Sequence, residues 1–410
     1  MVPLHKKLNS LIQRSPDPYH AVEAIREALG FTDFHLHSNK EFKPGKKYFL
    51  QKGGFCFAFI LPTKTIESFR LVGTHIDSPA LKLNAKPFVK KGERIYFDVD
   101  RSGGIMYTSW LDRDLLLSGK IVTDKGEKTV RLDSHLFSIP NCPIHIDREK
   151  NERHAFDPTK ELLPFVTADE KEVTLSKLLK EKTLYAFDLY LTPTQPGSLT
   201  GLDHQIFSSY RLDNMCSSFA AVEALLSAKP HKSALIGALF YNDEETGSMS
   251  IEGAESPFVT DVLEMICLTQ GLNRLQFLKI KDKSAFYSVD VAHAFVDGHD
   301  QKFQANHRLE LGKGIVIKRN HSLHYAYNIE LEANILKVLK KKSIPHQFFA
   351  PLTGKPSGST IGPHVAVRYG IRTLDLGIAI QSMHSARESL HIKDLEALVR
   401  FIKEVYVQVS

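Results

Sequence analysis

The sequence predicts an α/β fold that is interrupted by a β-rich insertion, and three observations support this prediction. Residues 235–241 form a short apolar run that is typical of a buried strand. Apolar strand-like runs alternate with amphipathic helical segments before residue 87 and after residue 200. From residue 88 to residue 199, β-like segments are instead separated by glycine turns and charged residues.

The first part of the chain places two polar side chains at the end of a strand. The spacing of apolar residues and the turn residues predict helices over residues 4–12 and 21–29. A β-hairpin is predicted over residues 47–61 and a strand over residues 69–72. The strand runs into Gly-Thr-His-Ile-Asp-Ser-Pro, which contains His75 and Asp77. Residues i and i+2 of an extended segment point the same way. His75 could therefore bind a metal while Asp77 orients its ring.

The predicted secondary structure of the inserted segment, residues 88–199, differs from that of the rest of the chain. Its predicted strands cover residues 95–100, 115–123 and 129–132, and four prolines between residues 140 and 164 indicate irregular structure. Two histidines, His135 and His145, lie in this segment. Each of them, taken alone, fits an ordinary surface or core histidine.

After residue 202 the α/β pattern returns. It predicts four helices, over residues 215–227, 259–267, 325–341 and 392–407. It also predicts four strands, over residues 235–241, 285–289, 314–318 and 371–376. Three of these strands are followed by residues that can bind metals, Glu244 and Glu245, Asp290, and His384. Taken alone, the glutamates fit a solvated acidic turn, and Asp213 fits the N-cap of the next helix.

Composition excludes several classes of function. Hydrophobic residues make up 42% and charged residues 24% of the chain, as in an ordinary soluble globular protein. The net charge of +6 is dispersed, which argues against nucleic-acid binding. No apolar run reaches membrane-spanning length and no signal peptide is recognised. The four cysteines are widely spaced, which predicts reduced thiols in a cytoplasmic protein.

The candidate residues together suggest a metal site. In open α/β sheets, ligands bind beyond the carboxyl ends of the strands. Two histidines and three carboxylates suit zinc, manganese or cobalt, and exceed what one catalytic zinc with an open position uses. They suit two metal ions about 3.5–4 Å apart that share one carboxylate and activate water. One glutamate of the pair Glu244 and Glu245 would then be free to act as general base.

These residues lie in motifs that resemble the aspartyl aminopeptidase family of co-catalytic zinc peptidases. The motifs follow one another in the family's order over nearly the whole chain, Gly-Thr-His-Ile-Asp-Ser-Pro, Trp-Leu-Asp-Arg-Asp-Leu, Arg-Leu-Asp-Asn, Asn-Asp-Glu-Glu-Thr-Gly-Ser, Val-Asp-Val-Ala-His-Ala, Gly-Ser-Thr-Ile-Gly-Pro and Ser-Met-His-Ser-Ala-Arg-Glu. The resemblance implies a three-layer α/β/α catalytic domain of residues 1–87 and 200–410. Residues 88–199 would form an inserted β-rich dimerisation domain.

The resemblance also implies a role for each site residue. Two zinc ions per subunit would be bound, with manganese or cobalt as possible occupants of one site. Asp213 would bridge the metals, and Asp77 would orient the His75 side. Glu244 would be the general base that takes a proton from water and passes it to the leaving amine. His75 and Asp290 would bind one metal, and Glu245 and His384 would bind the other.

Substrate binding and assembly are implied by the same resemblance. His293 and Lys318 match positions near the substrate, and a lysine there would favour a peptide with an acidic first residue by Coulomb attraction. Dimers would assemble into a tetrahedral dodecamer. His145 would reach the active site of the neighbouring subunit.

Four alternatives remain open at this point. One is an aminopeptidase of the same mechanism that prefers neutral or basic residues. The second is a di-zinc deacylase of small N-acyl amino acids, against which the motifs of the inserted segment argue. The third is a non-catalytic scaffold, but no ligand and no base is lost. The last is a nucleic-acid-binding protein, which salt-dependent binding would reveal.

Overall fold

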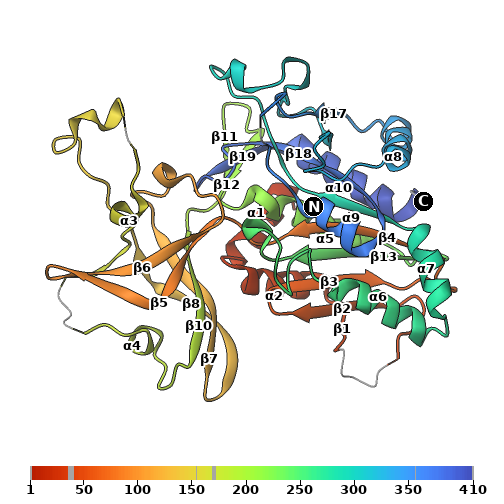
Figure 1. Cartoon of the computed structure of the whole chain (residues 1–410), viewed down its shortest axis with the longest axis horizontal. Coiled ribbons are helices and arrows are strands. Elements are labelled where there is room, and N and C mark those ends of the chain that lie inside the picture. The colour runs from red at the N-terminus through yellow and green to blue at the C-terminus, as the bar shows by residue number, and fades with distance from the viewer. Residues whose placement is uncertain (1, 36–40, 154, 169–171, 356, 409–410) are drawn as a thin grey trace.

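The computed structural model describes residues 2–35, 41–153, 155–168, 172–355 and 357–408 (Figure 1). Two β-sheets organise the chain, a large mixed sheet and a smaller antiparallel one. This arrangement confirms the predicted α/β class with a β-rich insertion. None of the helices in these residues is long and apolar enough to cross a membrane.

The large sheet follows the order β1-β2-β3-β13-β4-β14-β18-β19-β12-β11, with three further strands attached. The strands are β1 (Thr32–Asp33), β2 (Lys47–Lys52), β3 (Phe55–Ile60), β4 (Ser68–His75), β11 (Ser198–Thr200), β12 (Ile206–Ser209), β13 (Ala234–Tyr241), β14 (Ala285–Val289), β15 (Ala292–His293), β16 (Ile315–Lys318), β17 (His346–Phe349), β18 (Arg372–Gln381) and β19 (Glu388–His391).

Helices cover both faces of this sheet, which gives the three layers. One face packs against α1 (Leu4–Arg14), α2 (Pro18–Leu29), α5 (Leu212–Ser227), α8 (Ile329–Lys341) and α10 (Ile392–Gln408). The other face packs against α6 (Phe258–Thr269), α7 (Arg274–Asp282) and α9 (Ile361–Tyr369). β13 shows the alternation that this requires, because Ile236 and Ala238 belong to the first core and Leu235 and Leu239 to the second.

The smaller sheet is antiparallel and has its own core around the buried Trp110. Its order is β8-β7-β10-β5-β6-β9, formed by β5 (Ala80–Lys91), β6 (Arg94–Ser102), β7 (Leu115–Thr123), β8 (Gly126–Phe137), β9 (Phe165–Thr167) and β10 (Ala186–Pro193). The short helices α3 (Pro158–Glu161) and α4 (Leu175–Leu179) accompany it. Trp110 meets Tyr210 edge-on with ring centroids 5.6 Å apart, so the two sheets share a packed junction.

Several predicted element boundaries were wrong. The helix predicted over 325–341 begins only at Ile329, because Asn328 caps it by accepting from the Leu331 N–H. Helix α7 was not predicted, although Asn273 and Gln276 form a capping box at its start. Asp213 is not an N-cap, since Arg211 occupies that position and Asp213 lies in the first turn of α5.

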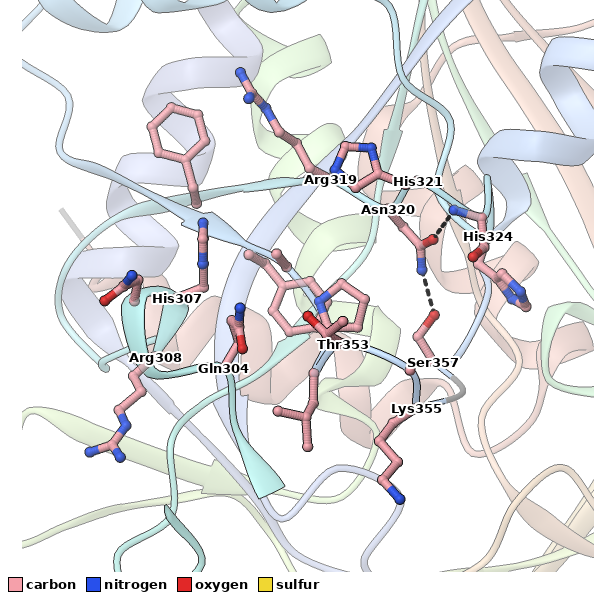
Figure 2. A pocket seen from close by; sticks show the side chains of 18 of the residues that line it. Gln304, His307, Arg308, Arg319, Asn320, His321, His324, Thr353, Lys355 and Ser357 are labelled. Carbon is pink, nitrogen blue, oxygen red and sulfur yellow. Dashed lines mark hydrogen bonds between the residues drawn. The ribbon is translucent and has the colours of Figure 1, made fainter. Parts of the chain in front are cut away.

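Two cavities adjoin each other beyond the end of β16. One, of about 250 Å³, is lined by the candidate site residues. The other, of about 900 Å³, is lined by the loops that follow β16 and β17 and by residues around 304–308 (Figure 2). Phe349 lines both of them.

Candidate metal centre

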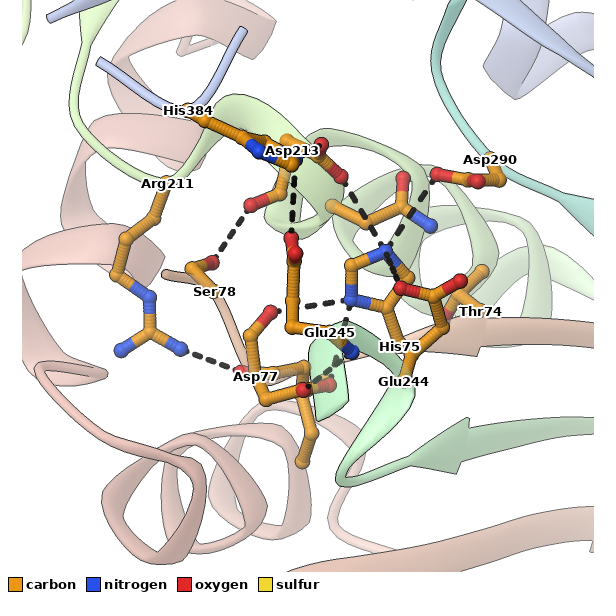
Figure 3. Close-up of polar contacts among 12 residues, drawn as sticks. Thr74, His75, Asp77, Ser78, Arg211, Asp213, Glu244, Glu245, Asp290 and His384 are labelled. Carbon is orange, nitrogen blue, oxygen red and sulfur yellow. Dashed lines mark hydrogen bonds and ion pairs between the residues drawn. The ribbon is translucent and has the colours of Figure 1, made fainter. Parts of the chain in front are cut away.

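Parallel strands bring most of the candidate residues to one edge of the large sheet (Figure 3). β4 pairs in parallel with β13 and β14, so the carboxyl ends of these three strands meet. His75 is the last residue of β4, and Asp290 follows β14 directly. Glu244 and Glu245 lie in a short 3-10 helix, Glu244–Thr246, which two residues separate from the end of β13.

Two further residues approach this edge from other elements. Asp213 lies in the first turn of α5, in a non-helical conformation, and a cis peptide bond joins it to Asn214. His384 lies in the loop between β18 and β19 with a positive φ of 66°. All seven residues predicted to form or support the centre, Asp77 among them, therefore lie together.

His75 stands among carboxylates. Its Nε2 atom is 3.2 Å from Oδ1 of Asp213, 3.5 Å from Oδ1 of Asp290 and 3.8 Å from Oε2 of Glu244. Its Nδ1 atom faces Asp77, 3.1 Å from the backbone oxygen and 3.4 Å from Oδ1. An Nδ1–H that donates to Asp77 leaves the Nε2 lone pair directed at the carboxylate cluster.

His384 faces the same aspartate from the other side. Its Nε2 atom is 3.3 Å from Oδ2 of Asp213 and 3.4 Å from Oε1 of Glu245. Asp213 thus offers one carboxylate oxygen to each histidine. Such an arrangement suits a bridging ligand between two cations.

The side chains form three groups of possible metal ligands, and within each group the ligand atoms lie within 4.8 Å of one another. Two of them have Asp213 in common, one with His75 and Asp290 and the other with Glu245 and His384. The third joins His75 to Glu244 and Glu245. The first two groups together contain all five predicted ligands, and only the third includes Glu244.

The electrostatics of the cluster show an excess of buried negative charge. Burial, helped by the carboxylates of Asp290 and Asp77, raises the pKa of Glu244 to about 8 against the attraction of His75. Burial and Asp213 likewise raise the pKa of Glu245 well above its ordinary value. Although burial opposes it, hydrogen bonding to Asp213 contributes to raising the pKa of His384 to about 10.

The residues present fit divalent metal ions. Among the described residues, the Oδ1 atom of Asp213 and the Oε1 atom of Glu245 are buried without a hydrogen-bond partner. A buried carboxylate oxygen without a donor is costly, and a cation would compensate it. Imidazole nitrogen with carboxylate oxygen is a donor set that zinc accepts.

Glu388 is a residue that the sequence analysis quoted in a motif without giving it a role. Its side chain is buried, and its two oxygens accept the backbone N–H groups of Asp213 at 2.9 Å and His384 at 2.7 Å. One carboxylate therefore connects the backbones that carry two candidate ligands. In the sequence Glu388 stands four residues after His384, but this spacing does not show that its carboxylate accepts two backbone N–H groups.

Of the three residues predicted to bind the substrate, two lie in the cavity of the metal centre and one does not. His293 and Lys318 line the 250 Å³ cavity together with the cluster. Lys318 is the last residue of β16 but is only 2% exposed, and its Nζ atom lies 3.4 Å from Oδ2 of Asp290. His145 is exposed in the inserted segment and does not line this cavity within the single chain.

An α/β sheet that gathers histidines and carboxylates at its carboxyl edge places the chain in the class of metal-dependent hydrolases. The chain belongs to the family described as Aminopeptidase I zinc metalloprotease (M18), whose model matches residues 11–406. It is therefore a zinc metallo-aminopeptidase, a hydrolase of the exopeptidase type.

Individual relatives agree with this assignment. The chain is 30% identical over 470 residues to the "Aspartyl aminopeptidase" of Dictyostelium discoideum, covering 99% of this chain and 97% of that protein. The "Cryo-EM structure of the Ape4 and Nbr1 complex" matches with 30% identity and a TM-score of 0.92, over 98% and 85% of the two chains. A structure of the mApe1 dodecamer of S. cerevisiae shares the fold, with 24% identity and a TM-score of 0.81 over 98% of this chain and 97% of that chain.

Proposed function

We propose that this aminopeptidase removes N-terminal residues, Asp and Glu in preference to others, through two metal ions and Glu244 as general base. The observation that carries the two-metal proposal is the placement of Asp213, whose two carboxylate oxygens each face a different histidine. The word "Aspartyl" in the name of the Dictyostelium relative supports the acidic preference.

The proposed ligands divide into two sets with Asp213 in common. His75 and Asp290 would hold one zinc ion, and Glu245 and His384 the other. When bound, two zinc ions would polarise the scissile carbonyl and acidify a water molecule. Manganese or cobalt could replace zinc in one site, because the donors are nitrogen and oxygen only. Asp77 would fix the ring of His75 and also accepts the backbone N–H of Glu245 at 3.0 Å.

Glu244 is proposed as the base because it lies beside the ligands without belonging to either set that shares Asp213. Its carboxylate is 3.8 Å from Nε2 of His75, so it can reach a water molecule at the centre. It would take a proton from that water as the water attacks the carbonyl carbon. The same carboxyl group would then give the proton to the amine that leaves when the peptide bond breaks.

Lys318 is proposed to select acidic first residues. Its ammonium is buried in the cavity wall, over the ring of Tyr325 at 5.2 Å from the centroid. A cation in such a dry place attracts a carboxylate more strongly than one in water. His293 lines the same cavity and would contact the substrate.

The inserted segment is proposed to serve assembly. We infer a catalytic domain of residues 1–87 and 200–410 and a dimerisation domain of residues 88–199, although β5 of the small sheet already starts at Ala80. A homo-oligomer, dimers assembled into a tetrahedral dodecamer, is supported by the dodecamer named for the yeast homologue. His145 would then complete the site of a neighbour. A cytoplasmic location stays a prediction.

The experiment that tests the proposal is hydrolysis of aminoacyl nitroanilides that carry Asp, Glu, Leu or Lys. Activity is measured before chelation, after chelation and after zinc, manganese or cobalt is returned, and bound metal is counted per subunit. We expect Asp and Glu cleavage that disappears with chelator and returns with metal, at two ions per subunit. Metal-dependent cleavage of only Leu or Lys would refute the acidic preference, and one ion per active subunit would refute the two-metal centre.

A further inference from the structure

The cavity of about 900 Å³ beside the metal centre has a basic lining (Figure 2). We call it the basic recess, and its cationic and histidine side chains are His307, Arg308, Arg319, His321, His324 and Lys355. Among the described residues that line it, none carries a carboxylate side chain. Its remaining polar lining consists of amides and hydroxyls, which can all donate hydrogen bonds.

The cations of the basic recess differ in how they are held. Arg319 donates to the buried Glu332, with its Nε atom 2.7 Å from Oε2, and Arg308 lies 2.8 Å from Asp300. Both guanidinium groups are thereby fixed in place. Lys355 is exposed, and within the described part of the chain its ammonium has no carboxylate partner. It is therefore free to meet an incoming anion.

The basic recess adjoins the metal centre at three places. Phe349 lines both cavities. At the end of β16, Lys318 points into the centre while the next residue, Arg319, lines the recess. Ser357 lines the recess, and the two residues that follow line the centre.

The sizes of the two cavities indicate what occupies each. About 250 Å³ at the centre accommodates little more than one amino-acid residue. The residues of a peptide beyond the first must lie outside it, and the basic recess is the adjoining space. Its positive lining matches the carboxylates of acidic side chains.

We propose that the basic recess binds acidic residues downstream of the scissile bond, so that the enzyme selects acidic peptides and not only an acidic first residue. This proposal rests on the proposed aminopeptidase function and extends it to the rest of the substrate. It assigns Lys355 to substrate recognition, at a distance from the residues that carry out the chemistry.

The test compares three substrates with the same first residue, whichever residue the enzyme cleaves best. One is a nitroanilide with nothing downstream, the second continues as Ala-Ala-Ala and the third as Ala-Glu-Glu. Each is measured with the assembled, metal-loaded wild type and with the Lys355→Glu variant. Lys279→Glu is the matched control, because Lys279 is an exposed lysine of α7 outside the recess.

In the wild type we expect a higher kcat/KM for the acidic peptide than for the neutral one. Lys355→Glu should lower that ratio by about fivefold or more while nitroanilide cleavage stays unchanged. Lys279→Glu should leave all three rates unchanged. An equal ratio in wild type and Lys355→Glu, or an equal loss for all three substrates in Lys355→Glu, would overturn the recess proposal. Absence of metal-dependent cleavage of the nitroanilide in the wild type would instead refute the proposed function.

Discussion

At the scale of single residues, the centre is defined by a small number of side chains that concentrate several negative charges in one place. Five candidate ligands and Glu244 come from five separate segments and lie within a few ångströms of each other. Four of these six are carboxylates, and the surrounding protein supplies Lys318 as the nearest buried lysine cation. Substitutions here should therefore separate metal binding, proton transfer and substrate choice.

Glu244→Gln tests proton transfer. The amide keeps the size of the side chain but cannot take a proton from water, so we expect kcat to fall by about 10²–10⁴-fold. Bound zinc should stay at the wild-type level if Glu244 is not a ligand, and metal analysis of the purified variant checks this. Loss of zinc together with activity would instead make Glu244 a ligand, as the group of His75, Glu244 and Glu245 allows.

Lys318→Met tests substrate choice. The change also removes the partner of Asp290, so absolute rates are hard to interpret. The ratio of kcat/KM for Asp- and Leu-nitroanilides cancels any common effect on the centre. We expect this ratio to fall by about 10-fold or more, because an acidic side chain loses a buried opposite charge. An unchanged ratio would show that the acidic preference is set elsewhere.

At the scale of elements, the ends of strands and helices set the positions of functional groups. Apolar runs made β4, β13 and β14 predictable, and with them the residues that follow each strand. Glu388 could not be assigned from the sequence because its role depends on two backbone N–H groups, 175 and 4 residues away. Helix α7 was not predicted because only Phe277 and Ile280 of it are buried, and two apolar positions are too few to give a clear helical periodicity.

Glu388→Gln tests the connection between the two ligand-bearing backbones. A glutamine has one acceptor oxygen, so one N–H would lose its acceptor and face an amide NH₂. We expect about a 10-fold loss of zinc affinity, measured by competition with a chelating dye. Excess zinc should restore much of the activity, which simple unfolding would not allow. Glu396→Gln, an exposed change on α10, is the control and should bind zinc as the wild type does.

Asp17→Asn tests the start of α2, away from the centre. Asp17 caps the helix and accepts from the ring of His20 at 2.6 Å. Despite burial, this pairing lowers the pKa of Asp17 below 3.8 and raises that of His20 above 6.5. The pair therefore stabilises the fold most between these values, and its contribution falls as pH rises through the folded-state pKa of His20.

Asparagine can still cap the helix but cannot attract a charged His20. We therefore expect Asp17→Asn to lower the unfolding temperature more at pH 5.5 than at pH 8.5, by a difference equivalent to about 1 kcal/mol. Calorimetry on chelated wild type and variant removes any contribution from metal. An equal decrease at both pH values would mean that His20 is not charged in the folded state.

At the scale of the whole molecule, two sheets meet at a packed junction beside the centre. The alternation of strands and helices was enough to predict the α/β class, and the change of pattern after residue 88 predicted a β-rich insertion. The three layers were implied only by the family resemblance. The contact of Trp110 with Tyr210 across the junction was not predictable, because side-chain packing between distant segments leaves no periodic signal.

The predicted role of His145 can be tested by mixing two variants. His145→Ala and Glu244→Gln should each be nearly inactive as pure oligomers. If His145 acts in a neighbouring subunit, dissociating and reassembling them together should restore measurable activity, because some sites receive both intact residues. No recovery in mixed oligomers, shown to be assembled by light scattering, would refute the action of His145 in a neighbouring subunit.

The spread of the ligands along the chain also bears on the order of events during synthesis. His75 is made early, but the group that contains His384 stays incomplete until the last segment before α10 has been translated. Domains fold as units, and long-range contacts form slowly. A nascent chain therefore cannot bind metal through all five proposed ligands before His384 has emerged from the ribosome.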